Sequence, residues 1–87
     1  MATWRKLDSE NYYCHLVPAN KSKNRAVISV HIPSDESGDE GCWVISESTE
    51  ETGWKESVVT WGFGKGMDDL ASDSLKKARK MGYYVPA

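Results

Sequence analysis

The last third of the chain contains its one strong helical pattern. Apolar residues recur there at spacings of three and four, namely Met67, Leu70, Ala71, Leu75, Ala78 and Met81. This spacing puts them on one face of a helix over about 67–81. Asp68 and Asp69 fall in its first turn and Gly82 just past its end, where the helix dipole and a left-handed cap favour them. Every earlier regular segment is typical of a strand, so this helix must cover the sheet.

The earlier segments predict four consecutive strands. The clearest runs over 25–32, where Ala26, Ile28, Val30 and Ile32 alternate with other residues. Aromatic and β-branched residues indicate further strands over 12–17, 42–47 and 57–63, with polar turns between them and a weaker signal over 4–7. Short strands joined in this way predict an antiparallel meander. We therefore expect one α+β domain over 1–87, a small antiparallel four-stranded sheet with one C-terminal helix packed on one face.

One helix is too narrow to cover both faces of such a sheet. Val59, Trp61 and Phe63 alternate along the last strand, and we expect them to pack beneath Leu70 and Leu75. The opposite face is predicted to show Val27, Ser29, His31, Cys42, Val44, Val58 and Thr60. That face is too apolar to lie bare in water, so either a second copy of the chain or another partner covers it, or loops and the Tyr-rich C-terminus do.

Negative charge is concentrated in the middle of the chain. The net charge is −2, yet residues 26–60 carry eight acidic side chains and one lysine. They fall mainly in and around two turns, with Asp35, Glu36, Asp39 and Glu40 in the first and Glu47, Glu50, Glu51 and Glu56 near the second. We expect one negative surface at one end of the sheet, able to steer the protein toward a basic partner. The competing interpretation is that these turns only keep a small protein soluble.

Motifs for chemistry are missing. The glycines between the last strand and the helix match no phosphate-binding loop, and Asp68 and Asp69 would repel a phosphate there. Cys14 and His15 are adjacent on a strand, so they point to opposite faces and cannot share a metal ion. No nucleophile motif or metal-ligand spacing is present. We therefore expect no enzyme activity, no catalytic residues, no metal and no cofactor.

Location follows from similar arguments. No stretch of about 18 apolar residues is present, so we expect no membrane span. The first residues lack the apolar core of a secretory signal, which predicts a cytoplasmic protein. Cys14 and Cys42 are then expected to be reduced thiols.

These observations favour a small non-enzymatic protein-binding module. Its partner would carry a basic surface and be steered by acidic side chains, namely Asp35, Glu36, Asp39, Glu40, Glu50 and Glu51. Trp54, beside the second acidic turn, is the expected apolar anchor. A small acidic domain of this kind is similar to phage-encoded inhibitors of host enzymes, anti-CRISPR proteins among them, and would inhibit a nucleic-acid-handling protein.

The alternative is a nucleic-acid-binding domain that combines stacking aromatic residues with basic ones. The basic residues are Arg5, Lys6, Lys21, Lys23 and Arg25 near the N-terminus and Lys76, Lys77, Arg79 and Lys80 on the helix. The acidic middle of the chain makes this alternative the less favoured one.

Overall fold

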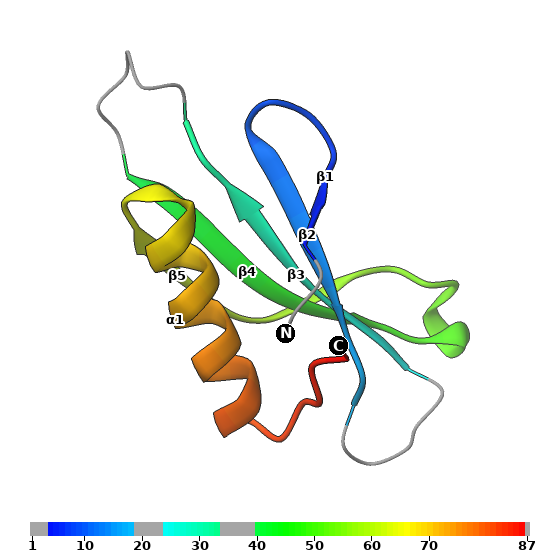
Figure 1. Cartoon of the computed structure of the whole chain (residues 1–87). Helices are drawn as coiled ribbons and strands as arrows, with labels where there is room; N and C mark the ends of the chain where they lie inside the picture. Colours follow the sequence, from blue (N-terminus) through cyan, green and yellow to red (C-terminus); the bar gives the residue numbers. More distant parts are fainter. Residues whose placement is uncertain (1–3, 19–23, 34–39, 87) are drawn as a thin grey trace.

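The computed structural model describes residues 4–18, 24–33 and 40–86. Within them, five antiparallel strands form one sheet in sequence order, followed by one helix. The strands are β1 (Arg5–Lys6), β2 (Asn11–Leu16), β3 (Arg25–His31), β4 (Gly41–Ser48) and β5 (Ser57–Gly64). A short 3₁₀ turn, η1 (Glu50–Thr52), precedes β5, and the helix is α1 (Gly66–Lys80). Figure 1 shows α1 crossing one face of the sheet. The predicted fold is confirmed, with the short β1 added at one edge.

Strand β3 carries the alternation that the sequence predicts. Ala26, Ile28 and Val30 are buried, whereas Arg25 and Ser29 are exposed. Ile28 lies opposite Cys14 of β2 and Ile45 of β4, so these three residues form one row across the centre of the sheet. Since side chains alternate between faces, β2, β3 and β4 supply the buried residues that the sheet contributes to the core.

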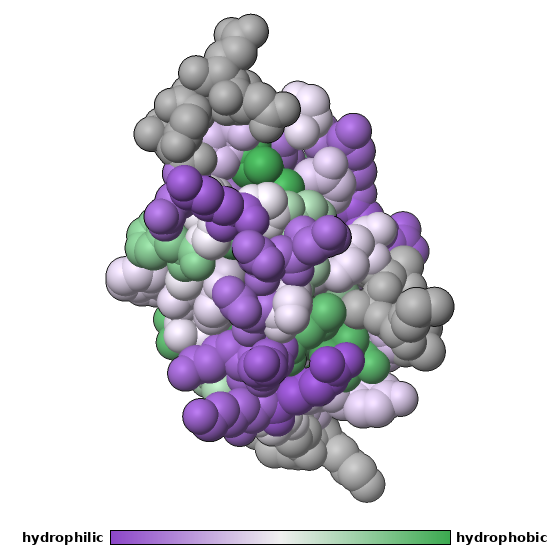
Figure 2. All heavy atoms as spheres, turned by 60° about the vertical axis from the view of Figure 1, so that its left-hand side comes forward, coloured by the Kyte–Doolittle hydropathy of each residue, from purple (hydrophilic) through white to green (hydrophobic). Residues whose placement is uncertain are grey.

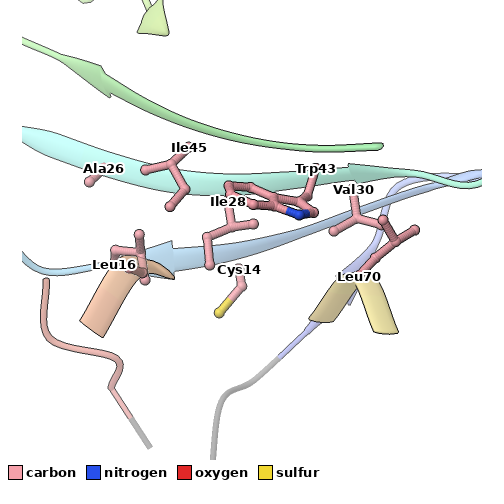
Figure 3. Packing of buried hydrophobic residues seen from close by; sticks show 9 residues of the cluster. Cys14, Leu16, Ala26, Ile28, Val30, Trp43, Ile45 and Leu70 are labelled. Carbon is pink, nitrogen blue, oxygen red and sulfur yellow. The ribbon is translucent and has the colours of Figure 1, made fainter. Parts of the chain in front are cut away.

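The core lies between this face of the sheet and α1. Figure 3 shows Ile28, Trp43 and Ile45 from the strands, with Leu70 of α1 next to Val30. Ile28, Ile45 and Leu70 are fully buried. Ala78 completes the core from the helix. Burial of this apolar surface is the main favourable term for the fold, at about 25 cal/mol per Å².

The segment after α1 also packs on the helix side. Tyr83 and Val85 contact the core cluster, and the Tyr83 hydroxyl donates a hydrogen bond to the Glu47 carboxylate. Burial raises the pKa of the Tyr83 phenol, and the Glu47 carboxylate raises it further because a negative charge disfavours the phenolate. Tyr84 and Val17 exchange two backbone hydrogen bonds of 2.8 Å. Tyr83 and Val85 therefore lie on the helix side of the sheet, and the prediction that the C-terminus covers the opposite face is wrong for these two residues.

The end of α1 has the predicted glycine cap. Gly82 has φ 95°, and the Tyr83 N–H donates to the Ala78 carbonyl at 2.9 Å. A left-handed residue followed by this bond is the pattern in which glycine ends a helix. The cap directs the chain back across the sheet toward Val17.

Candidate binding surface

We call the face of the sheet that points away from α1 the open face. Its residues alternate with the core residues and are Tyr13, His15, Val27, Ser29, His31, Cys42, Val44, Ser46, Val58, Trp61 and Phe63. One row runs from Tyr13 through Ser29 and Val44 to Trp61. Six of the seven residues predicted for this face lie on it. The exception is Thr60, which pairs with Ile45 and faces the core.

Trp61 and Phe63 lie on the open face, so the prediction that they pack beneath Leu70 and Leu75 is wrong. Each side chain is 60% exposed, and Val58 in the same strand is 63% exposed. The two rings meet edge to face, with centroids 5.3 Å apart and an interplanar angle of 74°. Such a pair stabilises itself and still presents apolar surface to a partner.

A bulge and a glycine explain why Trp61 and Phe63 of β5 face away from the core. Ile45 pairs with Thr60 and Ser46 with Val58, so Val59 is an extra residue that breaks the alternation. On the core side the indole of Trp43 takes the space above Gly62, where an added Cβ would come within 2.6 Å of the ring. In the pair formed by Trp43 and Gly62, the large side chain thus comes from β4 and not from β5. A pattern of apolar residues on β5 alone cannot reveal this.

Trp54 borders a hollow of about 380 Å³ on the open face. The hollow is lined by Tyr13, His15, Arg25, Val27, Ser46 and Trp54, among others. The Arg25 guanidinium lies 4.0 Å from the centre of the Trp54 ring, a cation–π contact. Trp54 has φ 64° and is 37% exposed. A tryptophan in this left-handed conformation is uncommon and costs about 1–3 kcal/mol, which the surrounding contacts must offset.

The turn before Trp54 holds it in place. The Trp54 N–H donates to the Thr49 carbonyl at 2.8 Å, and the Gly53 N–H donates to the Glu50 carbonyl at 3.0 Å. Glu50 and Glu51 are exposed in η1, directly before this point. The structure therefore brings three of the predicted binding residues, Glu50, Glu51 and Trp54, to one corner of the molecule.

The acidic residues that the structure describes do not form one surface, contrary to expectation. Glu40 is exposed just before β4 begins, whereas Glu50 and Glu51 follow its end. The two ends of an eight-residue strand lie about 23 Å apart at about 3.3 Å per residue. Glu40 therefore lies at one end of β4, and Glu50 and Glu51 lie at the other end. Asp35, Glu36 and Asp39 lie outside the described residues.

The basic residues are also divided. Arg5 and Lys6 form β1 at one edge of the sheet, Arg25 lies against Trp54, and Lys21 and Lys23 fall outside the described residues. Lys76, Lys77 and Lys80 line a second hollow of about 360 Å³ together with Asp73, Trp43, Gly62 and Phe63. Arg79 is exposed on α1 but does not line this hollow. The residues from α1 follow the 3,4 spacing of one helix face, which is the sequence signal that could have grouped them.

Figure 2 shows the molecule with the helix side turned forward. Hydrophilic side chains form a band across this side, and apolar residues show beside it. Lys76, Lys77 and Lys80 border β5 because they line one hollow together with Gly62 and Phe63. The nucleic-acid alternative combined aromatic residues with the helix lysines, and of the predicted basic residues only Lys76, Lys77 and Lys80 share a hollow with Phe63.

The remaining reactive groups do not converge. Cys14 lies in the core and Cys42 on the open face, and they form no disulfide. His15 is exposed next to the buried Cys14, so the two point to opposite faces as predicted. Among the described residues, no three His, Cys, Asp or Glu side chains lie close enough to hold a metal ion. Within the same residues, no helix is long and apolar enough to cross a membrane.

Comparison of the chain with protein-family models, with curated proteins and with solved structures gives no match.

Proposed function

We propose that this protein is a non-enzymatic protein-binding module that docks through its open face. The observation that carries the proposal is the exposure of Val58, Trp61 and Phe63 side by side on β5. A bare cluster of large apolar side chains costs free energy in water, at about 25 cal/mol per Å² of apolar surface left exposed. Tryptophan and other aromatic residues are also enriched among the residues that dominate binding energy.

Trp54 and the η1 turn supply the second part of the proposed contact. Trp54 is held over Arg25 at the border of the open face and can bury its ring in a partner. Glu50 and Glu51 would steer a partner that carries a basic surface toward this corner. A protein that handles nucleic acid has such a surface, so the most concrete form of the proposal is an inhibitor of the phage type.

Capture from a lysate of the natural host tests the proposal. The double variant Trp61→Ser/Phe63→Ser is expected to lose the captured partner. Met81→Ser, which changes an exposed apolar residue at the end of α1, is expected to retain it. Equal capture by all three proteins would contradict a contact through the open face.

Charge reversal separates the two acidic ends. Glu50→Lys/Glu51→Lys is expected to slow association and to make it less sensitive to salt, because steering acts mainly on the association rate. Glu40→Lys, at the far end of β4, is the matched control and is expected to have little effect. The reverse order of effects would move the contact to the start of β4.

Nucleic-acid binding remains the second candidate. The observation in its favour is that Phe63 and the three lysines of α1 line the same hollow. Aromatic stacking beside a row of cations is the usual way to hold a single strand. Titration with single- and double-stranded oligonucleotides tests it: binding that falls steeply as salt rises supports this candidate, and absence of binding at 50 mM salt removes it.

A second copy of the chain is the third possible occupant of the open face. Sedimentation at increasing concentration tests this directly. A dimer that disappears in Trp61→Ser/Phe63→Ser would replace the external partner with self-association.

A further inference from the structure

Strand β5 forms an unprotected edge of the sheet. It pairs with β4 on one side, and no other strand of the described chain pairs with its other side. Its eight residues include no charged residue and no proline. Edge strands usually carry such residues, because the outward backbone N–H and C=O groups otherwise accept another strand. The bulge at Val59 interrupts only the first half, which leaves residues 60–64 as regular strand.

The two sides of this edge differ in chemistry. Toward the open face it presents Trp61 and Phe63, each 60% exposed. Toward α1 it presents Gly62 and Gly64, which have no side chains. Beyond Gly62 lies the hollow where Lys76, Lys77 and Lys80 outnumber the one carboxylate, Asp73, and where Phe63 forms part of the rim. A strand laid along 60–64 would therefore meet aromatic rings toward the open face and a net positive group of side chains toward α1.

Because side chains alternate along a strand, the two sides of the β5 edge would favour a particular sequence in a strand that binds there. Successive side chains of an incoming strand point to opposite faces. Every second residue would meet Trp61 and Phe63, and the residues between would meet the lysines. The segment that fits has apolar residues at one set of positions and acidic residues at the other.

We propose that β5 binds an extended segment of a partner protein in which acidic and apolar residues alternate. The segment adds to the sheet as a further strand, with backbone hydrogen bonds to 60–64 and its carboxylates beside Lys76, Lys77 and Lys80. The inference rests on the proposed function and names the chemistry of the partner at this edge.

The lysines beside β5 favour an acidic peptide over the other two candidates, a second copy of the chain and a nucleic acid. A second copy of β5 is uncharged, so it would place no carboxylate beside the three lysines. A nucleic acid would place its phosphates beside the lysines but would leave the backbone groups of 60–64 without peptide partners. An acidic peptide strand satisfies the lysines and the strand edge together.

Three synthetic peptides provide the test, monitored by the amide signals of the ¹⁵N-labelled protein. Ac-EVEIEV-NH₂ alternates acidic and apolar residues, Ac-EEEVIV-NH₂ has the same composition without alternation, and Ac-KVKIKV-NH₂ reverses the charge. The first is expected to shift the amides of 60–64 and of the three lysines at millimolar concentration. The other two are expected to bind at least tenfold more weakly.

Two charge-reversal variants locate the contact. Lys77→Glu/Lys80→Glu is expected to weaken Ac-EVEIEV-NH₂ at least tenfold and to strengthen Ac-KVKIKV-NH₂. Arg79→Glu on the same helix does not line the hollow and is expected to change affinity less than twofold. These side chains are exposed, so the fold is expected to persist, and the unshifted core amides of each variant check it.

Several results would overturn the proposal. They are no shift at 60–64, equal binding of the non-alternating peptide, or an equal effect of Arg79→Glu. Concentration-dependent shifts of β5 without peptide would assign the edge to a second copy. Displacement of Ac-EVEIEV-NH₂ by a (dT)₁₂ oligonucleotide that shifts the same amides would assign it to nucleic acid. If the host partner is still lost from Trp61→Ser/Phe63→Ser while the peptides fail, the proposed function survives and the edge pairing does not.

Discussion

The two edges of the sheet are built in opposite ways. β1 is two residues long, and both, Arg5 and Lys6, are charged and exposed. β5 is eight residues long and uncharged, with Trp61 and Phe63 exposed. A short charged edge resists pairing with another strand, whereas a long uncharged edge invites it.

This difference indicates that β5, and not β1, is the edge at which a strand from another molecule can pair. At β1, Asp8 closes the following turn by accepting hydrogen bonds from the N–H groups of Glu10 and Asn11 at 2.8 and 3.0 Å. β5 pairs with β4 along one side, and on its core face Leu70 of α1 lies beside Gly41 and Gly64. β5 is thus supported by β4 and by the helix, whereas Asp8 closes the turn after β1.

The largest expected effect comes from removing the helix support of β5. Leu70→Ala is expected to lower the free energy of unfolding by about 2–5 kcal/mol, because Leu70 is fully buried and its loss leaves a cavity. Urea unfolding measures it. Met81→Ala changes an exposed residue directly after the same helix, and this control is expected to cost less than about 1 kcal/mol. A loss of that small size for Leu70→Ala would contradict this support of β5 by the helix.

Gly62→Ala tests the close contact between β5 and Trp43. The added Cβ would lie 2.6 Å from the indole, so the ring or the strand must move, at a cost of about 1–3 kcal/mol. Thermal unfolding measures the change. Lys6→Ala at the other edge is expected to stay within about 0.5 kcal/mol. Similar values for the two variants would remove this distinction between the edges.

A double-mutant cycle isolates the aromatic pair on β5. Trp61→Ala and Phe63→Ala are expected to couple by about 0.5–1.5 kcal/mol, as edge-to-face rings do. Unfolding in urea of the two single variants and the double variant gives this coupling energy. A value near zero would show that the pair does not stabilise itself in solution and that each ring acts alone.

The β1 edge is expected to show a small pH dependence. Backbone and side-chain hydrogen bonds from Glu10 and Asn11 hold the pKa of Asp8 below its usual value near 3.8. The stability that Asp8 contributes is therefore present above that value and is lost as pH falls through the lower, folded-state pKa. Unfolding measured from pH 5 to pH 2 checks this. Asp8→Asn is expected to flatten the dependence, and an unchanged slope would exclude Asp8 as its source.

The fold was predictable because its main signals are local. The alternation of Ala26, Ile28 and Val30 and the spacing of Leu70 and Ala78 each follow from one element alone. The glycine cap at Gly82 is equally local. The orientation of β5 was not predictable, because it depends on which strand supplies the large side chain at the Trp43–Gly62 pair.

The candidate surface was predictable only in part. The corner formed by Glu50, Glu51 and Trp54 follows from sequence neighbours. The meander topology would have separated Glu40 from Glu50, since consecutive turns lie at opposite ends of β4. The meeting of Phe63 with Lys76, Lys77 and Lys80 depends on how α1 crosses β5, which no local pattern records.

Site-specific cross-linking tests the central claim most directly. A photoreactive benzoylphenylalanine is placed at Phe63 on β5 or at Lys6 on β1, and each protein is irradiated in a lysate of the natural host. A cross-linked partner protein is expected from position 63 and none from position 6, and the product from position 63 is expected to be lost in Lys77→Glu/Lys80→Glu. Equal products from both positions, or a product from position 6 alone, would contradict it.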